Sequence, residues 1–178
     1  MNVFRFLVLG LLAVPATGAS AADTLMAQTA NGFYAAYATF HPSDGIPDAA
    51  GRAKYAPYLS PALDKLLAAA AAAQARFAKT NKDSPPLIEG DLFTTMFEGA
   101  TSYKVGGCKG DARNGSCAID LTYDNKHDAP TRWTDTLYLV RSAQGWRVDD
   151  IGYGGNWEYA NHGRLTETLR QTIADSGS

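Results

Sequence analysis

The fold is decided by residues 132–153, which read RWTDTLYLVRSAQGWRVDDIGY. Along residues 133–140 one set of alternating side chains is apolar apart from Asp135, and the other set is rich in threonine and tyrosine. A period of two is typical of a strand that buries one face. Residues 142–145 then predict a turn and residues 146–153 a partner strand, because two strand-like runs joined by a short Gly-containing segment form a β-hairpin.

Two more strands are expected before this hairpin. Residues 101–105 form a strand-like run that should end at Gly106-Gly107. Residues 117–123 alternate cleanly, and the side chains expected on one face are Cys117, Ile119, Leu121 and Tyr123. Together with the hairpin, these runs predict a four-stranded antiparallel meander.

Helices are expected on both sides of the strands. Residues 24–40 carry apolar side chains at spacings of three and four, which indicates an amphipathic helix, and His41-Pro42 should end it. Residues 43–57 predict a connection with at most one short turn. A second helix should begin with Ser60 as N-cap and end near residue 81, and residues 165–174 predict a short closing helix.

This order of elements predicts an α+β fold in which N-terminal helices pack on one face of a curved, cone-like four-stranded antiparallel sheet, with a short C-terminal helix. The hollow of such a cone is the first place to look for a ligand.

Residues 1–21 are typical of a secretory signal peptide. Arg5 is their only charge, the apolar stretch 6–14 is too short to span a bilayer, and Ala19-Ser20-Ala21 is a cleavage signal, so the mature chain should begin at Ala22. An uncleaved membrane anchor is the alternative. Residues 22–178 have the length of a single domain. We therefore expect an exported, periplasmic protein.

Charge and motifs exclude several classes of protein. Removal of Arg5 leaves 15 of the 16 basic side chains against 18 acidic ones, and they are scattered without a basic stripe, so nucleic acid is not expected as a partner. No later segment is apolar enough to cross a membrane, and no phosphate loop or dinucleotide fingerprint predicts a cofactor. The three histidines are not spaced as metal ligands. The sequence does not indicate an oligomeric state.

Cys108 and Cys117 flank a turn-rich segment between two expected strands. In an oxidising compartment such a pair predicts a disulfide that closes the first hairpin of the sheet. A zinc site and a redox pair are the alternatives, but zinc lacks further ligands at useful spacing, and the spacing differs from Cys-x-x-Cys.

The segment Leu139-Val140-Arg141, its turn, and Gly145-Trp146-Arg147-Val148-Asp149-Asp150-Ile151 resembles the terminal hairpin of the nuclear transport factor two-like (cystatin-like) superfamily. Residues 25–172 also resemble a bacterial family of small exported proteins catalogued as domain of unknown function 3828. The pieces that carry this second resemblance are the same terminal hairpin together with Phe33-Tyr34 and Tyr37, Tyr58-Leu59-Ser60, Pro85-Pro86, Gly90-Asp91 with Phe93, and Trp133-Thr134-Asp135. The resemblance implies the cone-like fold and export, and it implies no activity. Some members of that family are lipoproteins, whereas this chain has no lipobox cysteine.

Three carboxylates are candidates for a binding site. Asp135 falls on a face that otherwise looks buried, so it must be paired or neutral. It either lies in a pocket with Tyr123 and Trp133 or forms a cross-strand ion pair; the arginines near enough in the sequence are Arg132, Arg141 and Arg147.

Asp149-Asp150 ends a strand, and alternation should turn one carboxylate towards the helices and the other towards solvent. Asp150 is then either a general base in the cone or an acceptor for backbone N–H groups and arginine. Asp91 follows a glycine, and it is expected either to cap or form a turn or to contact a ligand.

The aromatic, Gly-rich segment 153–159 adds Tyr153 and Trp157 to the candidates. Tyrosine and tryptophan in a loop are common at interfaces, although these rings could equally fold back over the open end of the sheet.

No catalytic constellation emerges from these residues. The expected function is therefore that of a non-enzymatic binding or accessory protein for a periplasmic protein or a small ligand, with inhibition of an envelope enzyme as one version. A small pocket enzyme of the isomerase or dehydratase kind, with Asp135 or Asp150 as base and Tyr123 as hydrogen-bond donor, is the alternative. An envelope-stability protein without a ligand is the third hypothesis.

Overall fold

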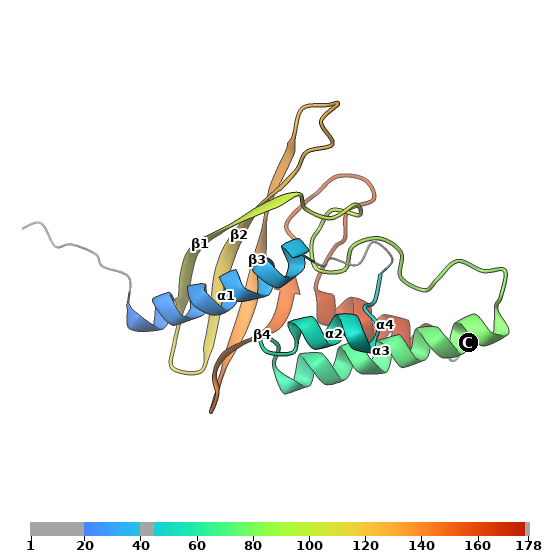
Figure 1. Ribbon diagram of the computed structural model, residues 1–178, viewed down its shortest axis with the longest axis horizontal. Coiled ribbons are helices and arrows are strands. Elements are labelled where there is room, and N and C mark those ends of the chain that lie inside the picture. The colour runs from blue at the N-terminus through green and yellow to red at the C-terminus, as the bar shows by residue number, and fades with distance from the viewer. Residues whose placement is uncertain (1–19, 40–44, 177–178) are drawn as a thin grey trace, which may run out of the picture.

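The computed structural model describes residues 20–39 and 45–176 (Figure 1). In chain order its elements are α1 (Ala21–Thr39), α2 (Ala49–Tyr55), α3 (Pro61–Thr80), β1 (Ser102–Gly110), β2 (Asn114–Tyr123), β3 (Thr131–Ser142), β4 (Gly145–Gly152) and α4 (Leu165–Asp175). The strands form one antiparallel sheet in the order β1-β2-β3-β4, which is a meander. The predicted α+β class, the meander and the short C-terminal helix are confirmed.

Two predictions fall outside the described residues. The expected signal peptide lies outside them up to residue 19, and so does the expected end of the first helix at His41-Pro42. Within the described ranges, no helix is both long enough and apolar enough to cross a membrane.

The inner face of the sheet carries the core. Alternate residues of β2 and β3 are buried, with Ile119 opposite Asp135 and Leu121 opposite Trp133. α1 lies across this face (Figure 1) and contacts β1, β2 and β4 through a buried stripe. The side chains of that stripe are Met26, Ala30, Phe33, Tyr34 and Tyr37. Burial of this apolar area is the main stabilising contribution.

The other helices gather beside β4 (Figure 1), where α3 packs against α4. α3 begins as predicted, because the Ser60 hydroxyl accepts a hydrogen bond from the Leu63 amide at 3.0 Å. The same hydroxyl donates to Asp149 at 2.6 Å. Residues 58–60 also pair with Val148, so they cover the outer edge of β4 and protect it from pairing with another chain.

The segment 43–57 contains more structure than its sequence indicates. α2 forms because the Asp48 side chain accepts a hydrogen bond from the Gly51 amide at 2.7 Å, and because Tyr55 is buried at the other end of the helix. Arg52 of this helix pairs with Asp64 of α3 at 3.0 Å.

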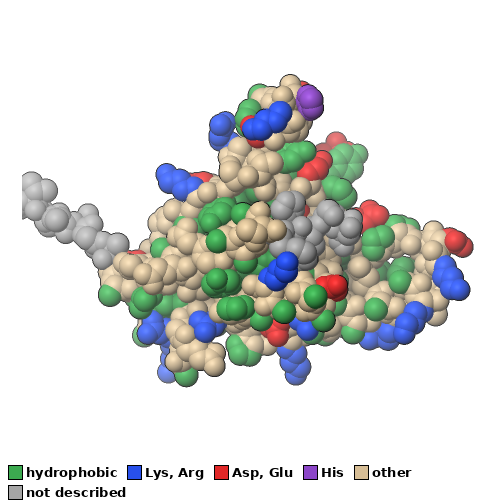
Figure 2. All heavy atoms as spheres, in the orientation of Figure 1, with side chains coloured by type: hydrophobic (Ala, Val, Ile, Leu, Met, Phe, Trp, Pro, Cys, Tyr) green, Lys and Arg blue, Asp and Glu red, His purple; other side chains and the backbone are tan. Residues whose placement is uncertain are grey.

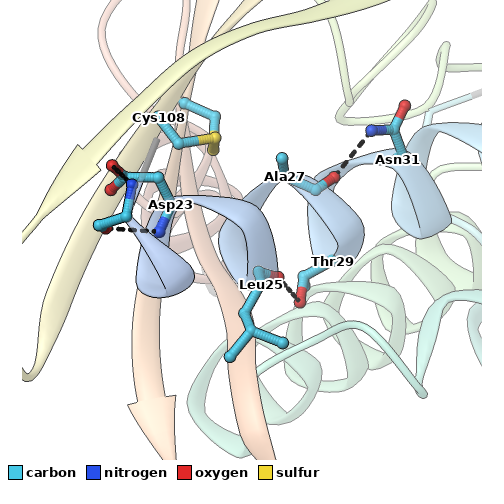
Figure 3. The surroundings of a disulfide bond; sticks show 8 residues. Asp23, Leu25, Ala27, Thr29, Asn31 and Cys108 are labelled. Atoms are coloured by element: carbon cyan, nitrogen blue, oxygen red, sulfur yellow. Dashed lines mark hydrogen bonds between the residues drawn. A yellow bond between two sulfur atoms is a disulfide. The ribbon is translucent and has the colours of Figure 1, made fainter. Parts of the chain in front are cut away.

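The predicted disulfide between Cys108 and Cys117 is confirmed, and the two residues lie directly opposite each other in β1 and β2. Figure 3 shows Cys108 pointing from β1 towards the N-terminal half of α1. The expected end of β1 at Gly106-Gly107 is wrong, since the strand continues to Gly110 through an irregularity between Val105 and Cys108. Backbone hydrogen bonds between strands need no side chain. Pairing with β2 and the disulfide therefore continue β1 beyond the two glycines.

Candidate functional site

Residues 88–100 link α3 to β1 without a regular helix or strand, and most of them are buried. A buried irregular segment must satisfy its backbone groups through the surrounding structure. Here α1 supplies two tyrosines: the Tyr34 hydroxyl donates to the Phe93 carbonyl at 3.4 Å, and the Tyr37 hydroxyl accepts from the Ala100 amide at 2.8 Å. The segment is therefore built into the core.

Asp135 joins this segment to the sheet. Its carboxylate, with 0% exposure, accepts hydrogen bonds from the Thr95 amide at 2.9 Å, the Thr95 hydroxyl, the Trp133 indole N–H at 3.1 Å and the Gly154 amide at 2.9 Å. Both oxygens thus have two donors each. Burial raises the pKa of Asp135, and the donated hydrogen bonds act in the opposite direction.

The cross-strand ion pair expected for Asp135 is wrong. None of its hydrogen bonds or ion pairs involves Arg132, Arg141 or Arg147. The reason is tertiary: Thr95 and Gly154 approach from two distant segments and occupy the acceptor positions that an arginine would need.

Asp91 organises the buried segment from within. Its Oδ1 atom accepts hydrogen bonds from the Phe93 and Thr94 amides, both at 2.8 Å, which is the predicted turn-forming role. Burial raises the pKa of Asp91 to about 7. The Asn161 side chain donates to the Asp91 and Thr94 carbonyls at 2.9 and 2.8 Å and so ties residues 153–163 to the same segment.

Tyr153 belongs to this network as well. Its hydroxyl donates to the Leu92 carbonyl at 2.8 Å, and burial raises its pKa. We call the set Asp91, Thr94, Thr95, Trp133, Asp135, Tyr153 and Asn161 the buried polar network.

Asp150 lies outside the buried polar network. It accepts hydrogen bonds from the Thr166 amide at 3.0 Å and the Thr166 hydroxyl at 2.9 Å, and Arg164 contacts it at 3.5 Å. The side chain therefore satisfies the first turn of α4, as an acceptor for backbone N–H groups and arginine. Its neighbour Asp149 is not left in solvent but binds Ser60 at the start of α3.

A groove opens where the two connecting segments meet the ends of β2 and β3. Its volume is about 610 Å³, within the range of small-molecule sites. We call it the aromatic groove; its lining residues are Met96, Phe97, Glu98, Tyr123, Thr131, Trp157, Glu158 and Tyr159. Figure 2 shows hydrophobic and acidic side chains together at the base of the projecting β2–β3 hairpin, where these segments lie.

Two rings of the aromatic groove are unusually exposed for their size. Phe97 is 45% exposed and Tyr159 is 81% exposed. The backbone of Tyr159 also has φ 66°, a left-handed conformation that costs a bulky residue free energy. Strained residues of this kind cluster at binding sites.

Trp157 connects the aromatic groove to the buried polar network. Its ring meets that of Trp133 edge to face, with centroids 5.7 Å apart, while the Trp133 indole N–H is held by Asp135. The wall of the groove therefore rests on a buried tryptophan whose indole N–H donates to Asp135.

The structure divides the predicted site residues into three groups. Tyr123 and Trp157 meet in the aromatic groove, whereas Asp150 lies at the start of α4. The remaining candidates, Asp91, Trp133, Asp135 and Tyr153, lie in the buried polar network. Thr95, Phe97 and Glu98 were missed, because residues 92–100 show neither helical nor strand periodicity that would place their side chains.

Among the described side chains, no three His, Cys, Asp or Glu residues come together as a metal site would require. Comparison of the chain with protein-family models, with curated proteins and with solved structures gives no match.

Proposed function

We propose that this protein is exported to the periplasm and acts as a non-enzymatic binding protein that holds a small organic ligand in the aromatic groove. The observation that carries the proposal is a groove of about 610 Å³ that presents four aromatic rings, two of which are exposed to solvent. Ligand sites combine such apolar linings with a few polar groups. Two acidic side chains supply the polar part here.

Preorganisation supports the same proposal. The segments that carry Phe97 and Trp157 are fixed to each other through Asp135, Thr95 and Gly154. A site that is rigid before binding loses less conformational entropy when the ligand arrives. The buried polar network lies directly behind the groove and would keep its lining residues in a conformation that is ready to bind.

The alternative of a small pocket enzyme has less support. A general base needs a substrate within hydrogen-bond reach, but Asp135 is fully buried and accepts four hydrogen bonds from the protein. Aromatic side chains of α1, α2 and residues 88–100 pack on one another where a cone would be hollow. The helices-then-meander order supports membership of the nuclear transport factor two-like superfamily, and we propose that assignment for the fold.

The binding function is tested with Phe97→Ala and Tyr159→Ala. A panel of small amphiphilic compounds is screened by thermal shift and by tryptophan emission, because Trp157 lines the groove. Compounds that bind the wild-type chain should bind each variant about tenfold more weakly, as expected for the loss of a contact residue worth more than 1 kcal/mol.

Leu25→Ala is the matched control, since Leu25 is 44% exposed, lies on α1 and does not line the groove. Unchanged binding in both groove variants would contradict the proposal, and so would a panel without any binder. Binding of a periplasmic protein that survives both substitutions would place the function at another surface. For the export part, the intact mass of protein purified from a bacterial periplasm should correspond to a chain that starts at Ala22.

A further inference from the structure

We propose that the ligand of the aromatic groove is an organic cation, a molecule whose apolar body carries an ammonium or guanidinium group. This inference rests on the proposed function, because it names the ligand class for the same groove. It is carried by the charges and the rings that line the groove together.

The charges of the groove have one sign. Glu98 and Glu158 line it, and no lysine, arginine or histidine is among its lining residues. Both carboxylates are exposed, and within residues 20–39 and 45–176 neither takes part in an ion pair. Lys126, the lysine of the turn between β2 and β3, is itself paired with Asp124 at 2.7 Å. The negative charge of the groove is therefore not neutralised by the described part of the chain.

The rings favour the same kind of ligand. The face of an aromatic ring is electrostatically negative, so tryptophan, tyrosine and phenylalanine attract a cation that lies over them. Trp157, the strongest of these ring types for a cation, is held in orientation by its edge-to-face contact with Trp133. Tyr123, Phe97 and Tyr159 bring three more rings to the same space.

Rings and carboxylates together discriminate between ligand charges. An anion would be repelled by Glu98 and Glu158, and a neutral molecule would gain only the apolar contacts. A cation gains from both sets at once, and its apolar body fits the aromatic lining. The geometry therefore points to a cation with a hydrocarbon part, rather than to an inorganic ion.

Matched pairs of probes test the charge alone. Choline is compared with its uncharged isostere 3,3-dimethylbutanol, and benzylamine with benzyl alcohol, by titration of ¹⁵N-labelled full-domain protein. Each cation should bind about tenfold more tightly than its neutral counterpart, and added NaCl should reduce that difference. The indole resonance of Trp157 should move, whereas that of Trp146, at the opposite end of β3 and β4, serves as the internal reference.

The charge contribution is then removed with the double variant Glu98→Gln/Glu158→Gln. In this variant the preference for the cationic probe should fall severalfold, and the smaller preference that remains should be the contribution of the aromatic rings. Asp83→Asn/Glu89→Gln is the control, because it removes the same number of exposed negative charges outside the groove. It should leave the preference for the cation unchanged.

The outcomes separate the two proposals. Equal binding of charged and neutral probes to the wild-type groove would overturn the cation inference and leave the binding function standing. A preference for the cation that is undiminished in Glu98→Gln/Glu158→Gln would also overturn the inference. If neither probe pair moved the Trp157 resonance, the inference would fail, and the compound panel would then decide the binding function.

Discussion

At the scale of single residues, Asp135 stands out as a carboxylate with 0% exposure on the apolar face of β3. It accepts four hydrogen bonds in the core, from Thr95, Trp133 and Gly154. In the described part of the chain no basic side chain pairs with this carboxylate. It is tolerated in the core because neutral N–H and O–H donors replace the hydrogen bonds of the lost hydration shell. Its structural role is to join β3 to residues 88–100 and to residues 153–163.

Asp135→Asn should therefore be costly, although the two side chains have the same shape. In asparagine an NH2 group replaces one carboxylate oxygen and cannot accept a hydrogen bond. The two donors that this oxygen accepts from in the wild type would then have no acceptor. We expect a loss of roughly 2–4 kcal/mol in the free energy of unfolding. Urea denaturation followed by tryptophan emission measures it. Asp120→Asn is the control, since Asp120 is exposed and accepts from Thr134 at 2.8 Å on the same sheet; a similar loss in both variants would contradict this account.

Asp91 predicts a dependence of stability on pH. Its pKa is about 7 in the folded protein against an ordinary value of 3.8, because burial disfavours the charged form. The native state thus holds a proton that the unfolded state has released between these two values. The stabilising contribution is fully present below pH 3.8 and is lost as the pH rises through about 7.

The free energy of unfolding should fall between those two pH values with a slope of at most about 1.4 kcal/mol per pH unit from this group. Asp91→Asn keeps the Oδ1 acceptor for the Phe93 and Thr94 amides but cannot titrate. In this variant the free energy of unfolding should therefore fall less steeply as the pH rises. Urea titrations at four pH values between 4.5 and 7.5 would show it. Parallel pH profiles for wild type and variant would rule out this role for Asp91, and any remaining slope of the same sign would fit the raised pKa of Asp135.

At the scale of elements, β1 depends on the bond between Cys108 and Cys117. β1 is an edge strand of the sheet, and two consecutive glycines and an irregularity in register weaken its pairing with β2. The disulfide holds the strand beyond that irregularity. Glycine, an irregular register and the lysines of β1 also make this edge a poor template for another strand.

The double variant Cys108→Ala/Cys117→Ala should lower the free energy of unfolding by about 2–3 kcal/mol, the chain-entropy value for so short a loop. Amide hydrogen exchange should speed up in residues 107–110 and stay slow in β3. A reductant should lower the melting temperature of the wild-type protein and leave the variant unchanged. If the reductant affected neither protein, the disulfide would have no stabilising role.

At the scale of the whole molecule, two irregular segments far apart in the chain form one surface. Residues 88–100 and 153–163 meet through Asn161, Thr95 and Gly154, and the aromatic groove lies where they reach the ends of β2 and β3. The helices beside β4 have a different role. Asp149 and Asp150 hold the first turns of α3 and α4 against that strand. The helices beside β4 thus stabilise the sheet through contacts that do not include the lining residues of the candidate binding surface.

Much of the fold follows from local patterns. The 3–4 spacing of α1, the Ser60 cap with Pro61 in α3, and the alternation of β2 and β3 each depend on residues close in sequence. Such patterns report which face is buried, and they were sufficient for the meander and for the disulfide. They failed at Gly106-Gly107, where pairing with β2 extends the strand although the glycines carry no side chain to show it.

The sequence by itself determined the α+β class, the order of the strands, the cap of α3 and the burial of Asp135, because helix and strand periods state directly which side chains face the core. Only the tertiary structure decided what Asp135 binds, that Phe97, Glu98 and Tyr159 join Tyr123 and Trp157 in one groove, and that Asp150 serves α4. For Asp135 and for the groove, the physical reason lies in the irregular segments that contact them. Irregular segments have no period, so the positions of their side chains are set by hydrogen bonds to residues far away in the chain.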